Sequence, residues 1–194
     1  NHTGNSVVEA AGGGIDTVFS SVDYTLDANV ENMILTGTAA INGTGNDLDN
    51  IITGNSGANV LTGGAGNDTY AVDNIGDAVV ENAGAGTDTV INKLCWQSYT
   101  LGANIENMSM AGYGQTGIGN GLDNTLTVTT FAAYTNDDVL NGGAGADTMS
   151  GGNGGDTYYV DNGGDVVIEA SNYGTDTIKS SVSYTLSANV ENME

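Results

Sequence analysis

Three nine-residue stretches decide the fold of this chain: Gly63-Gly-Ala-Gly-Asn-Asp68-Thr-Tyr70-Ala71, Gly142-Gly-Ala-Gly-Ala-Asp147-Thr-Met149-Ser150 and Gly151-Gly-Asn-Gly-Gly-Asp156-Thr-Tyr158-Tyr159. All three read Gly-Gly-x-Gly-x-Asp-x-apolar-x, and the last two follow each other without a spacer. Glycine-rich turns free backbone carbonyls for a hard cation, the aspartate adds negative charge, and the apolar residue points into a narrow core. The pattern predicts an all-β solenoid with calcium bound at its turns.

The three stretches resemble the repeat of the haemolysin-type, or repeats-in-toxin (RTX), calcium-binding proteins, and they match it at every fixed position. The resemblance implies a right-handed parallel β-roll with little or no helix, in which two nonapeptides form one coil and each calcium ion lies between turns two repeats apart. It also implies bacterial type I secretion and an extracellular location. Parallel strands lie about 4.8 Å apart, so stacked turns would face a common gap.

The composition points to a cation before it points to a protein partner. The chain has 194 residues with 24 acidic and two basic side chains, and its formal net charge is −22. Two carboxylates about 5 Å apart repel by roughly 3 kcal/mol at an effective dielectric constant near 20. Such a chain needs either disorder or counter-cations, and disorder in the absence of metal stays open. Nucleic acid is excluded as a partner because its phosphates require basic residues.

Several other classes of protein are also disfavoured. The single Cys95 rules out an internal disulfide, and no apolar run approaches the length of a membrane span. His2 is the only histidine and is read as a surface residue, and Gly54-Asn-Ser56-Gly-Ala58 lacks the second glycine of a nucleophile elbow. We therefore predict no enzyme activity. There is no initiating Met and no signal-peptide pattern, so both ends are read as cuts through a longer chain.

A larger repeat is built from the small ones. The phrase Tyr24-Thr-Leu-Asp-Ala-Asn-Val-Glu-Asn-Met33 returns as Tyr99-Thr-Leu-Gly-Ala-Asn-Ile-Glu-Asn-Met108 and as Tyr184-Thr-Leu-Ser-Ala-Asn-Val-Glu-Asn-Met193. Each copy follows a Val-Val-Glu or Val-Ile-Glu phrase and an Asp-Thr-apolar phrase. Self-similarity of this kind is typical of solenoids. We predict one continuous solenoid with modules at 1–72, 73–160 and 161–194.

The nine-residue register extends beyond the perfect copies when the glycines are allowed to vary. It places Asp77 and Asp88 after the first perfect copy, with a slip of two residues between them, and Asp138, Asp165 and Asp176 around the other two. An insertion near 128–132 interrupts the second module. Stacking by two repeats pairs these aspartates as Asp68 with Asp88, Asp138 with Asp156, Asp147 with Asp165, and Asp156 with Asp176.

The resemblance assigns calcium-ligand roles residue by residue. The aspartates of the perfect copies carry them most directly, with the aspartates of the degenerate copies and the turn glycines beside them. The full set of predicted metal residues is Gly63, Gly64, Gly66, Asp68, Asp77, Asp88, Asp138, Gly142, Gly143, Gly145, Asp147, Gly151, Gly152, Gly154, Asp156, Asp165 and Asp176.

One alternative applies to all of these turns: a metal-free Asx-turn whose aspartate merely accepts backbone N–H groups. The earlier turns have Asn50 and Asn59 at the aspartate position, so they either hold calcium weakly or replace it by asparagine hydrogen bonds. Cys95 and Trp96 lie in a stretch three residues longer than in the other copies, which we read as a tolerated loop with a free thiol. The alternatives there are a contact loop or an intermolecular disulfide.

Three functions fit this sequence. The first is an extracellular structural segment, such as a shaft, adhesin, surface-layer or fibre element, which folds on binding calcium and associates end to end with further copies of itself. The second is a calcium-binding tail of a secreted hydrolase or toxin whose catalytic domain lies elsewhere. The third is recognition of ice or polysaccharide by Thr44, Thr53 and Thr62, which recur every nine residues. That run is short, and successive copies alternate sides, so the third function is disfavoured.

Overall fold

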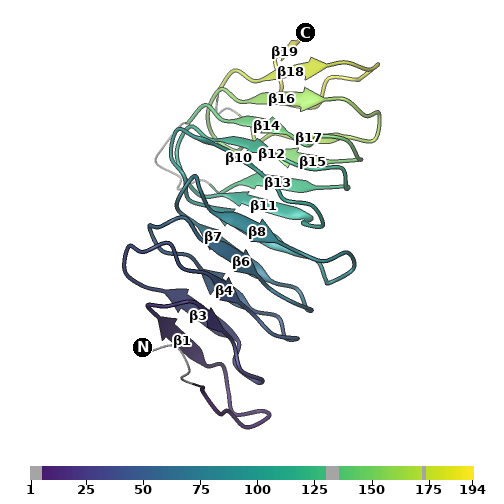
Figure 1. The fold of residues 1–194 in the computed structure, drawn as a ribbon. Coiled ribbons are helices and arrows are strands. Elements are labelled where there is room, and N and C mark those ends of the chain that lie inside the picture. The colour runs from purple at the N-terminus through teal and green to yellow at the C-terminus, as the bar shows by residue number, and fades with distance from the viewer. Residues whose placement is uncertain (1–5, 130–135, 172–173) are drawn as a thin grey trace. The chain divides into compact units, whose positions relative to one another are not determined.

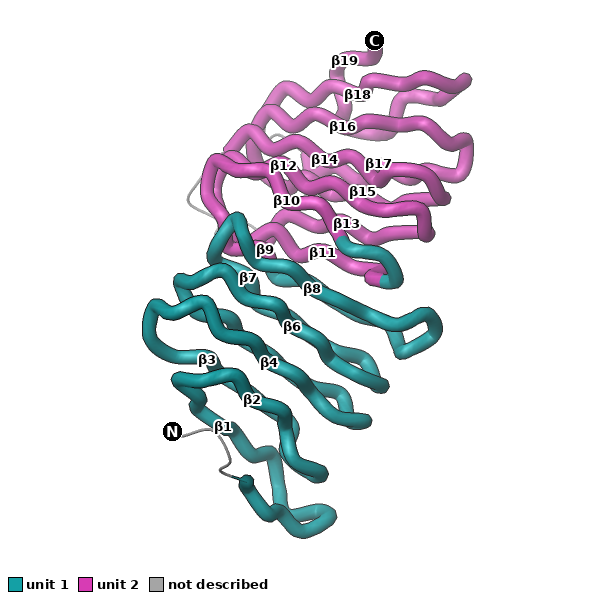
Figure 2. Tube along the Cα trace, viewed as in Figure 1, with its two compact units in different colours: residues 1–91, 102–104 teal, residues 92–101, 105–194 magenta. Residues whose placement is uncertain are grey.

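The computed structural model describes residues 6–129, 136–171 and 174–194, and the chain forms two compact units (Figure 2). Unit 1 comprises residues 1–91 and 102–104, and unit 2 comprises residues 92–101 and 105–194. Short parallel strands joined by turns build both units, and the described residues contain no helix. The predicted all-β parallel solenoid is therefore confirmed.

Successive strands of unit 1 alternate between two parallel sheets (Figure 1). The first sheet of this unit contains β1 (Thr17–Ser20), β3 (Asn32–Leu35), β5 (Ile51–Thr53), β7 (Thr69–Val72) and the start of β9 (Thr89–Asn92). The second contains β2 (Tyr24–Thr25), β4 (Gly43–Thr44), β6 (Val60–Thr62) and β8 (Ala78–Val80).

Unit 2 is built in the same way. One of its sheets contains β11 (Asn107–Met110), β13 (Thr125–Val128), β15 (Thr148–Ser150) and β17 (Val166–Ile168). The other contains β10 (Ser98–Thr100), β12 (Thr116–Ile118), β14 (Val139–Asn141), β16 (Thr157–Val160), β18 (Thr177–Ser180) and β19 (Asn192–Met193).

Strand register shows that two nonapeptides make one coil. Ile51 of β5 pairs with Thr69 of β7, and Val139 of β14 pairs with Thr157 of β16, a separation of 18 residues in both cases. The separation grows to 23 between β13 and β15, where the predicted insertion lies, because Thr125 pairs with Thr148. The strands on either side of this insertion stay paired in register.

The side chains from the eighth position of the repeats form the centre of the core. Leu61, Tyr70, Leu140, Met149 and Tyr158 each have no exposed surface. The repeated Tyr-Thr-Leu phrase adds its leucine and the following valine or isoleucine to the core in the first two copies, whereas the leucine of the third copy is 39% exposed. Each coil buries its apolar side chains only against its neighbours, so the interactions between stacked coils decide the stability of the fold.

Some sequence predictions concern residues outside the described ranges. His2 lies there, as do most of the 128–132 insertion and the start of the repeat that leads to Asp138. Cys95 and Trp96 are described, and both are exposed. The described part of the chain offers no helix long and apolar enough to cross a bilayer. The module boundaries stay a prediction.

Candidate calcium centres

Side chains from the sixth position of the repeats link the coils of unit 2 into two ladders. In the longer one, the backbone N–H of Asp138 donates to Asp156 Oδ1 at 2.8 Å, and the N–H of Asp156 donates to Asp176 Oδ1 at 2.8 Å. Gln115 and Glu191 extend this ladder at its two ends. In the shorter one, the N–H of Asp147 donates to Asp165 Oδ1 at 3.0 Å.

Unit 1 repeats the arrangement with asparagine at the start of each ladder. The N–H of Asn50 donates to Asp68 Oδ1 and the N–H of Asp68 donates to Asp88 Oδ1, at 2.7 and 2.8 Å. On the other ladder the N–H of Asn59 donates to Asp77 Oδ1 at 2.9 Å. The structure thus places each of the four predicted aspartate pairs on neighbouring coils.

The second carboxylate oxygen separates these aspartates into two groups. Oδ2 of Asp77 accepts the N–H groups of Asp73 and Asn74, and Oδ2 of Asp165 makes the corresponding pair of bonds. These two residues fit the metal-free Asx-turn. The other group contains Asp68, Asp138, Asp147 and Asp156, whose Oδ2 atoms are buried and have no hydrogen-bond partner among the described residues.

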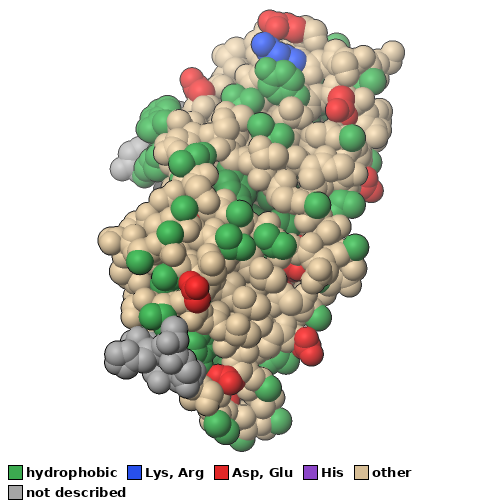
Figure 3. Space-filling model, viewed as in Figure 1, with side chains coloured by type: hydrophobic (Ala, Val, Ile, Leu, Met, Phe, Trp, Pro, Cys, Tyr) green, Lys and Arg blue, Asp and Glu red, His purple; other side chains and the backbone are tan. Residues whose placement is uncertain are grey.

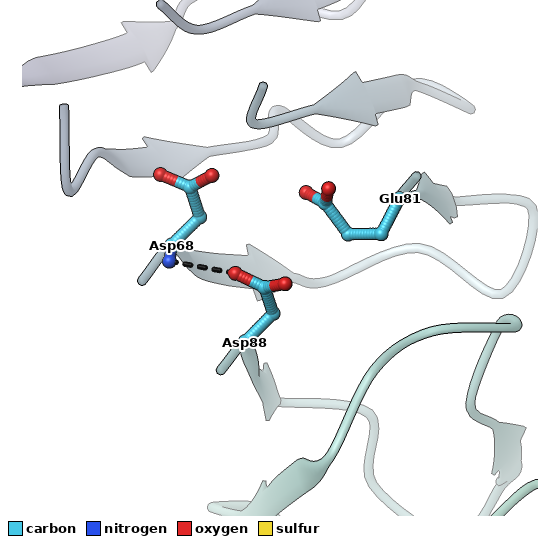
Figure 4. Close-up of side chains that lie close together, drawn as sticks. All are labelled: Asp68, Glu81 and Asp88. Carbon is cyan, nitrogen blue, oxygen red and sulfur yellow. Dashed lines mark hydrogen bonds between the residues drawn. The ribbon is translucent and has the colours of Figure 1, made fainter. Parts of the chain in front are cut away.

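Two clusters of three carboxylates stand out among the described residues. Asp68, Glu81 and Asp88 of unit 1 have ligand atoms that all lie within 4.8 Å of one another, and all three side chains are buried (Figure 4). Asp156, Glu169 and Asp176 form the equivalent cluster in unit 2. The sequence analysis predicted the aspartates but missed Glu81 and Glu169. The signal was the repeated Val-Val-Glu or Val-Ile-Glu phrase, whose glutamate follows the perfect-repeat aspartate by 13 residues in both modules.

A buried tyrosine holds the glutamate in each cluster. The Tyr70 hydroxyl donates to Glu81 Oε1, and the Tyr158 hydroxyl donates to Glu169 Oε1. A Cβ on Gly151 would lie 2.1 Å from Asp156 Oδ2 and 2.3 Å from the Tyr158 hydroxyl. The absence of a side chain at this glycine therefore leaves the space where the phenol, the unpartnered aspartate oxygen and the glutamate converge.

Burial and mutual repulsion raise the pKa values of these carboxyls. Burial is the main cause for Asp156, whose pKa rises to about 7, with Asp138 and Asp176 adding repulsion. The pKa of Asp68 likewise rises to about 7, chiefly by burial, with Glu81 and Asp88 contributing. The pKa of Glu169 rises to about 8 through burial and through the charges of Asp176 and Asp156. Each shift means that the charged form is disfavoured in the metal-free fold.

The predicted glycines lie in the turns beside these side chains. Six of them have φ angles between +83° and +136°: Gly64, Gly66, Gly143, Gly145, Gly152 and Gly154. At Gly143, with a φ of +85°, a Cβ would also lie 2.4 Å from the carbonyl oxygen of Asn120 on the neighbouring coil. Gly63, Gly142 and Gly151 lack a positive φ but abut the aspartate of their own repeat. The turn glycines are thus required by backbone conformation or by close packing.

Much of the negative charge lies inside the fold. Acidic side chains form separate spots on the face in Figure 3, and ten acidic residues among the described ones are buried. Exposed Lys179 forms an ion pair with exposed Glu194, with 3.6 Å between Nζ and Oε2. Ten buried carboxylates far exceed what two lysines can neutralise, so cations from solution or protonation of the carboxyls must offset their charge.

The donor set fits calcium. Calcium takes six to eight oxygen ligands from carboxylates, carbonyls and water, and accepts irregular geometry. Each cluster supplies three carboxylates, and the unpartnered Oδ2 of Asp68 or Asp156 marks the place where a cation would complete the coordination. The site contains no histidine or cysteine, so softer metals such as zinc are poorly matched.

Comparison with known proteins agrees with this chemistry. Residues 44–74 and 133–167, about a third of the chain, match the family of RTX calcium-binding nonapeptide repeats, in four copies. A curated relative is the endo-1,3-1,4-beta-glycanase ExsH of Rhizobium meliloti (strain 1021), which is 48% identical over 50 residues. That match spans 26% of this chain and 10% of the glycanase. No solved structure gave a significant match. The chain is a β-solenoid that contains four RTX calcium-binding nonapeptide repeats, within residues 44–74 and 133–167.

Proposed function

We propose that this chain is a calcium-dependent extracellular structural segment that stiffens into a β-roll where calcium is abundant. The observation that carries the proposal is the group of buried aspartates whose Oδ2 atoms have no hydrogen-bond partner among the described residues. Bound calcium would supply positive charge and oxygen coordination between coils. Because ions bind the folded chain and not the unfolded one, calcium adds its binding free energy to folding.

RTX repeats are typical of extracellular proteins exported by type I secretion. In a cytosol poor in calcium, the repulsion among buried carboxylates would keep the chain unfolded and ready for export. Outside the cell, calcium at millimolar levels would drive folding. The segment would then serve as a shaft, adhesin, surface-layer or fibre element, and coils of successive copies could continue one another. We propose no catalytic role for the segment itself.

The test is far-UV circular dichroism of chelator-stripped protein during titration with calcium, with magnesium as the control. Magnesium demands a tighter octahedral geometry, so calcium alone should give a cooperative increase in β structure. Sedimentation of the same samples measures association. A spectrum that is rich in β structure in chelator and unchanged by calcium would overturn the proposal.

A second candidate is a calcium-binding tail of a secreted hydrolase. The match to a segment of the glycanase ExsH supports it, since that segment is only 10% of the enzyme. The two candidates differ in the parent chain: a catalytic domain beside the repeats favours the tail, and further modules favour the shaft. Growth in mass on adding calcium, measured in the sedimentation experiment, also favours the shaft or fibre.

A further inference from the structure

The glutamate of each cluster lies outside the nonapeptide repeat, and the structure restrains it from three directions. In unit 2, Tyr158 donates its hydroxyl to Glu169 Oε1, and the N–H of Ala170 donates to Oε2 at 3.1 Å. The Nδ2 of Asn189 donates to the Glu169 carbonyl oxygen at 3.0 Å. Because its carboxylate and its backbone carbonyl are both held by hydrogen bonds, Glu169 is pre-organised to bind a ligand.

The asparagine that holds the glutamate comes from the repeated phrase Tyr-Thr-Leu-x-Ala-Asn. Asn29, Asn104 and Asn189 occupy the same position in its three copies, with φ angles of +68°, +63° and +64°. This left-handed conformation is tolerated by asparagine better than by most residues. Each amide donates to the carbonyl of the preceding module glutamate: Glu9, Glu81 and Glu169 respectively. The phrase therefore holds the backbone of the glutamate through its asparagine and also adds apolar side chains to the core.

We propose that Glu81 and Glu169 are calcium ligands that the nonapeptide motif does not supply, and that they create one strong calcium site in each unit. The proposal rests on the proposed calcium binding and names where the tightest ions lie. The two clusters use the same residue types at the same spacing, Asp, then Glu 13 residues later, then Asp after seven more. Tyr158 and Asn189, with Tyr70 and Asn104 in unit 1, are positioning residues.

An acidic cluster alone would not make this case. The independent observation is Asp156 Oδ2, which is buried without a hydrogen-bond partner among the described residues and lies against the Gly151 backbone beside the Tyr158 hydroxyl. Asp68 Oδ2 has the same surroundings beside Gly63 and Tyr70. By contrast, Asp147 and Asp165 belong to no three-carboxylate cluster in the part of the chain that the structure describes. Calcium affinity rises with the number of charged ligands and with the rigidity of the site, so the two kinds of site should differ measurably.

The first test counts ions bound to the whole chain by calorimetric titration with calcium. The wild-type chain should bind two ions tightly, with weaker binding elsewhere. Glu169→Gln should keep one tight ion and weaken the other at least about tenfold, since a charged ligand is replaced by a neutral one. The control Asp123→Asn removes the same charge from an exposed turn of unit 2, and it should keep both tight ions.

The second test addresses positioning. Asn189→Gly keeps the left-handed backbone but removes the amide, and we expect about three- to tenfold weaker binding at one tight site. Asn29→Gly is the matched control, because it removes the same bond to Glu9, which lies in no three-carboxylate cluster among the described residues. Circular dichroism at saturating calcium checks that each variant folds. Terbium emission sensitised by tyrosine should also fall in Tyr158→Phe, since that phenol touches the proposed site.

The outcomes separate this inference from the proposed function. A wild-type chain that binds no calcium overturns both. A wild-type chain that folds with calcium, together with Glu169→Gln that keeps two tight ions of unchanged affinity, overturns only the role of the glutamate. An equal loss in Asn29→Gly and Asn189→Gly would show that the asparagine acts on folding alone, and would overturn its positioning role.

Discussion

The coils that have asparagine at the sixth position of the repeat differ from those that have aspartate there in how the buried polar side chain finds hydrogen-bond partners. Asn50 Oδ1 accepts the N–H of Asn46, and its Nδ2 donates to the Glu31 carbonyl of the preceding coil at 3.1 Å. Asp156 accepts one backbone N–H through Oδ1, and its Oδ2 is buried without a hydrogen-bond partner among the described residues. An amide carries both donor and acceptor, whereas a carboxylate can only accept.

The comparison teaches that the same turn geometry accepts an amide or a carboxylate, two groups that differ in a single atom. Asn124 shows it again in unit 2, where Oδ1 accepts the N–H of Asn120 and Nδ2 donates to the Ile105 carbonyl at 2.9 Å. Where nitrogen replaces oxygen, the side chain satisfies the neighbouring carbonyls itself. Where oxygen remains, backbone N–H groups satisfy it at Asp77 and Asp165. At Asp156 no such donor among the described residues reaches Oδ2, and its buried charge is left to a cation or a proton, because an unpaired buried charge is costly.

Removing calcium should give the largest difference between the two kinds of coil. In chelator, amides of β14 to β18 should lose hydrogen-exchange protection by about a thousandfold, because their carboxylates then repel one another. Amides of β4 to β6 should lose much less, since asparagine amides replace the ion there. Hydrogen exchange read by mass spectrometry measures both regions in one sample. An equal loss in both would contradict the comparison.

A side chain at a turn glycine should have the next largest effect. Gly143→Val places a branched residue at a φ of +85° and its Cβ 2.4 Å from the Asn120 carbonyl oxygen. We expect a loss of about 3 kcal/mol in unfolding free energy with calcium present, from backbone strain and overpacking together. Gly163→Val is the control, since its Cβ would meet no atom within 4 Å. Denaturant unfolding that gives equal losses would refute the role of Gly143.

Replacing the sixth-position aspartate of one coil by asparagine should lower the stability of the chain with calcium and raise it without calcium. Asp156→Asn should weaken calcium binding at the unit 2 cluster about 100-fold, because a ligand charge is lost. The same change should stabilise the calcium-free chain, because a buried carboxylate near Asp138 and Asp176 becomes neutral. Thermal unfolding in chelator and in calcium measures the two effects. A variant less stable than wild type in chelator would contradict the prediction.

Low pH should partly replace calcium in stabilising the fold, because protons neutralise the buried carboxylates. Among these predictions we expect this change in stability to be the smallest. The folded-state pKa of Asp156 is about 7 and that of Asp138 about 6, whereas unfolded aspartate titrates at about 4. The calcium-free fold therefore binds more protons than the unfolded chain. Its stability is greatest below pH of about 4 and is lost as the pH rises through about 7.

We accordingly expect more β structure at pH 5 than at pH 8 in chelator, measured by circular dichroism. Calcium binding should be weaker at pH 5, because protons compete for the same oxygens. Asp156→Asn should show a smaller pH dependence, which serves as the control. More structure at pH 8 than at pH 5 would reverse the sign and refute the assignment of raised pKa values.

Much of the fold was predictable because the nonapeptide is a local code. Glycines at fixed places demand turns, and an apolar residue every nine positions demands a narrow core. The pairing of Asp147 with Asp165 followed from two repeats per coil, and the structure places them on neighbouring coils. The different states of Asp77 and Asp156 were not predictable, since the bonds to their second oxygens depend on the backbone path of the turn that precedes each aspartate, as the N–H groups of Asp73 and Asn74 show for Asp77.

The glutamates mark the limit of the sequence argument. Glu81 and Glu169 come directly after a degenerate repeat and fill none of its nine positions. They reach the clusters only because a coil returns the chain 20 residues later. The role of Asn104 and Asn189 was hidden for the same reason: their amides bond to carbonyls 23 and 20 residues earlier.

The sequence by itself determined the solenoid, the apolar eighth position and the large excess of negative charge, because each depends on local turn chemistry and on composition. The parallel strands followed from its resemblance to the RTX repeat. The tertiary structure decided which oxygens lack partners, which aspartates are satisfied by backbone N–H groups, and which distant glutamates join them. Those outcomes depend on how one coil lies against the next. The physical reason is that the groups that surround a carboxylate oxygen come from neighbouring coils, so its hydrogen-bond partners exist only once the coils are stacked.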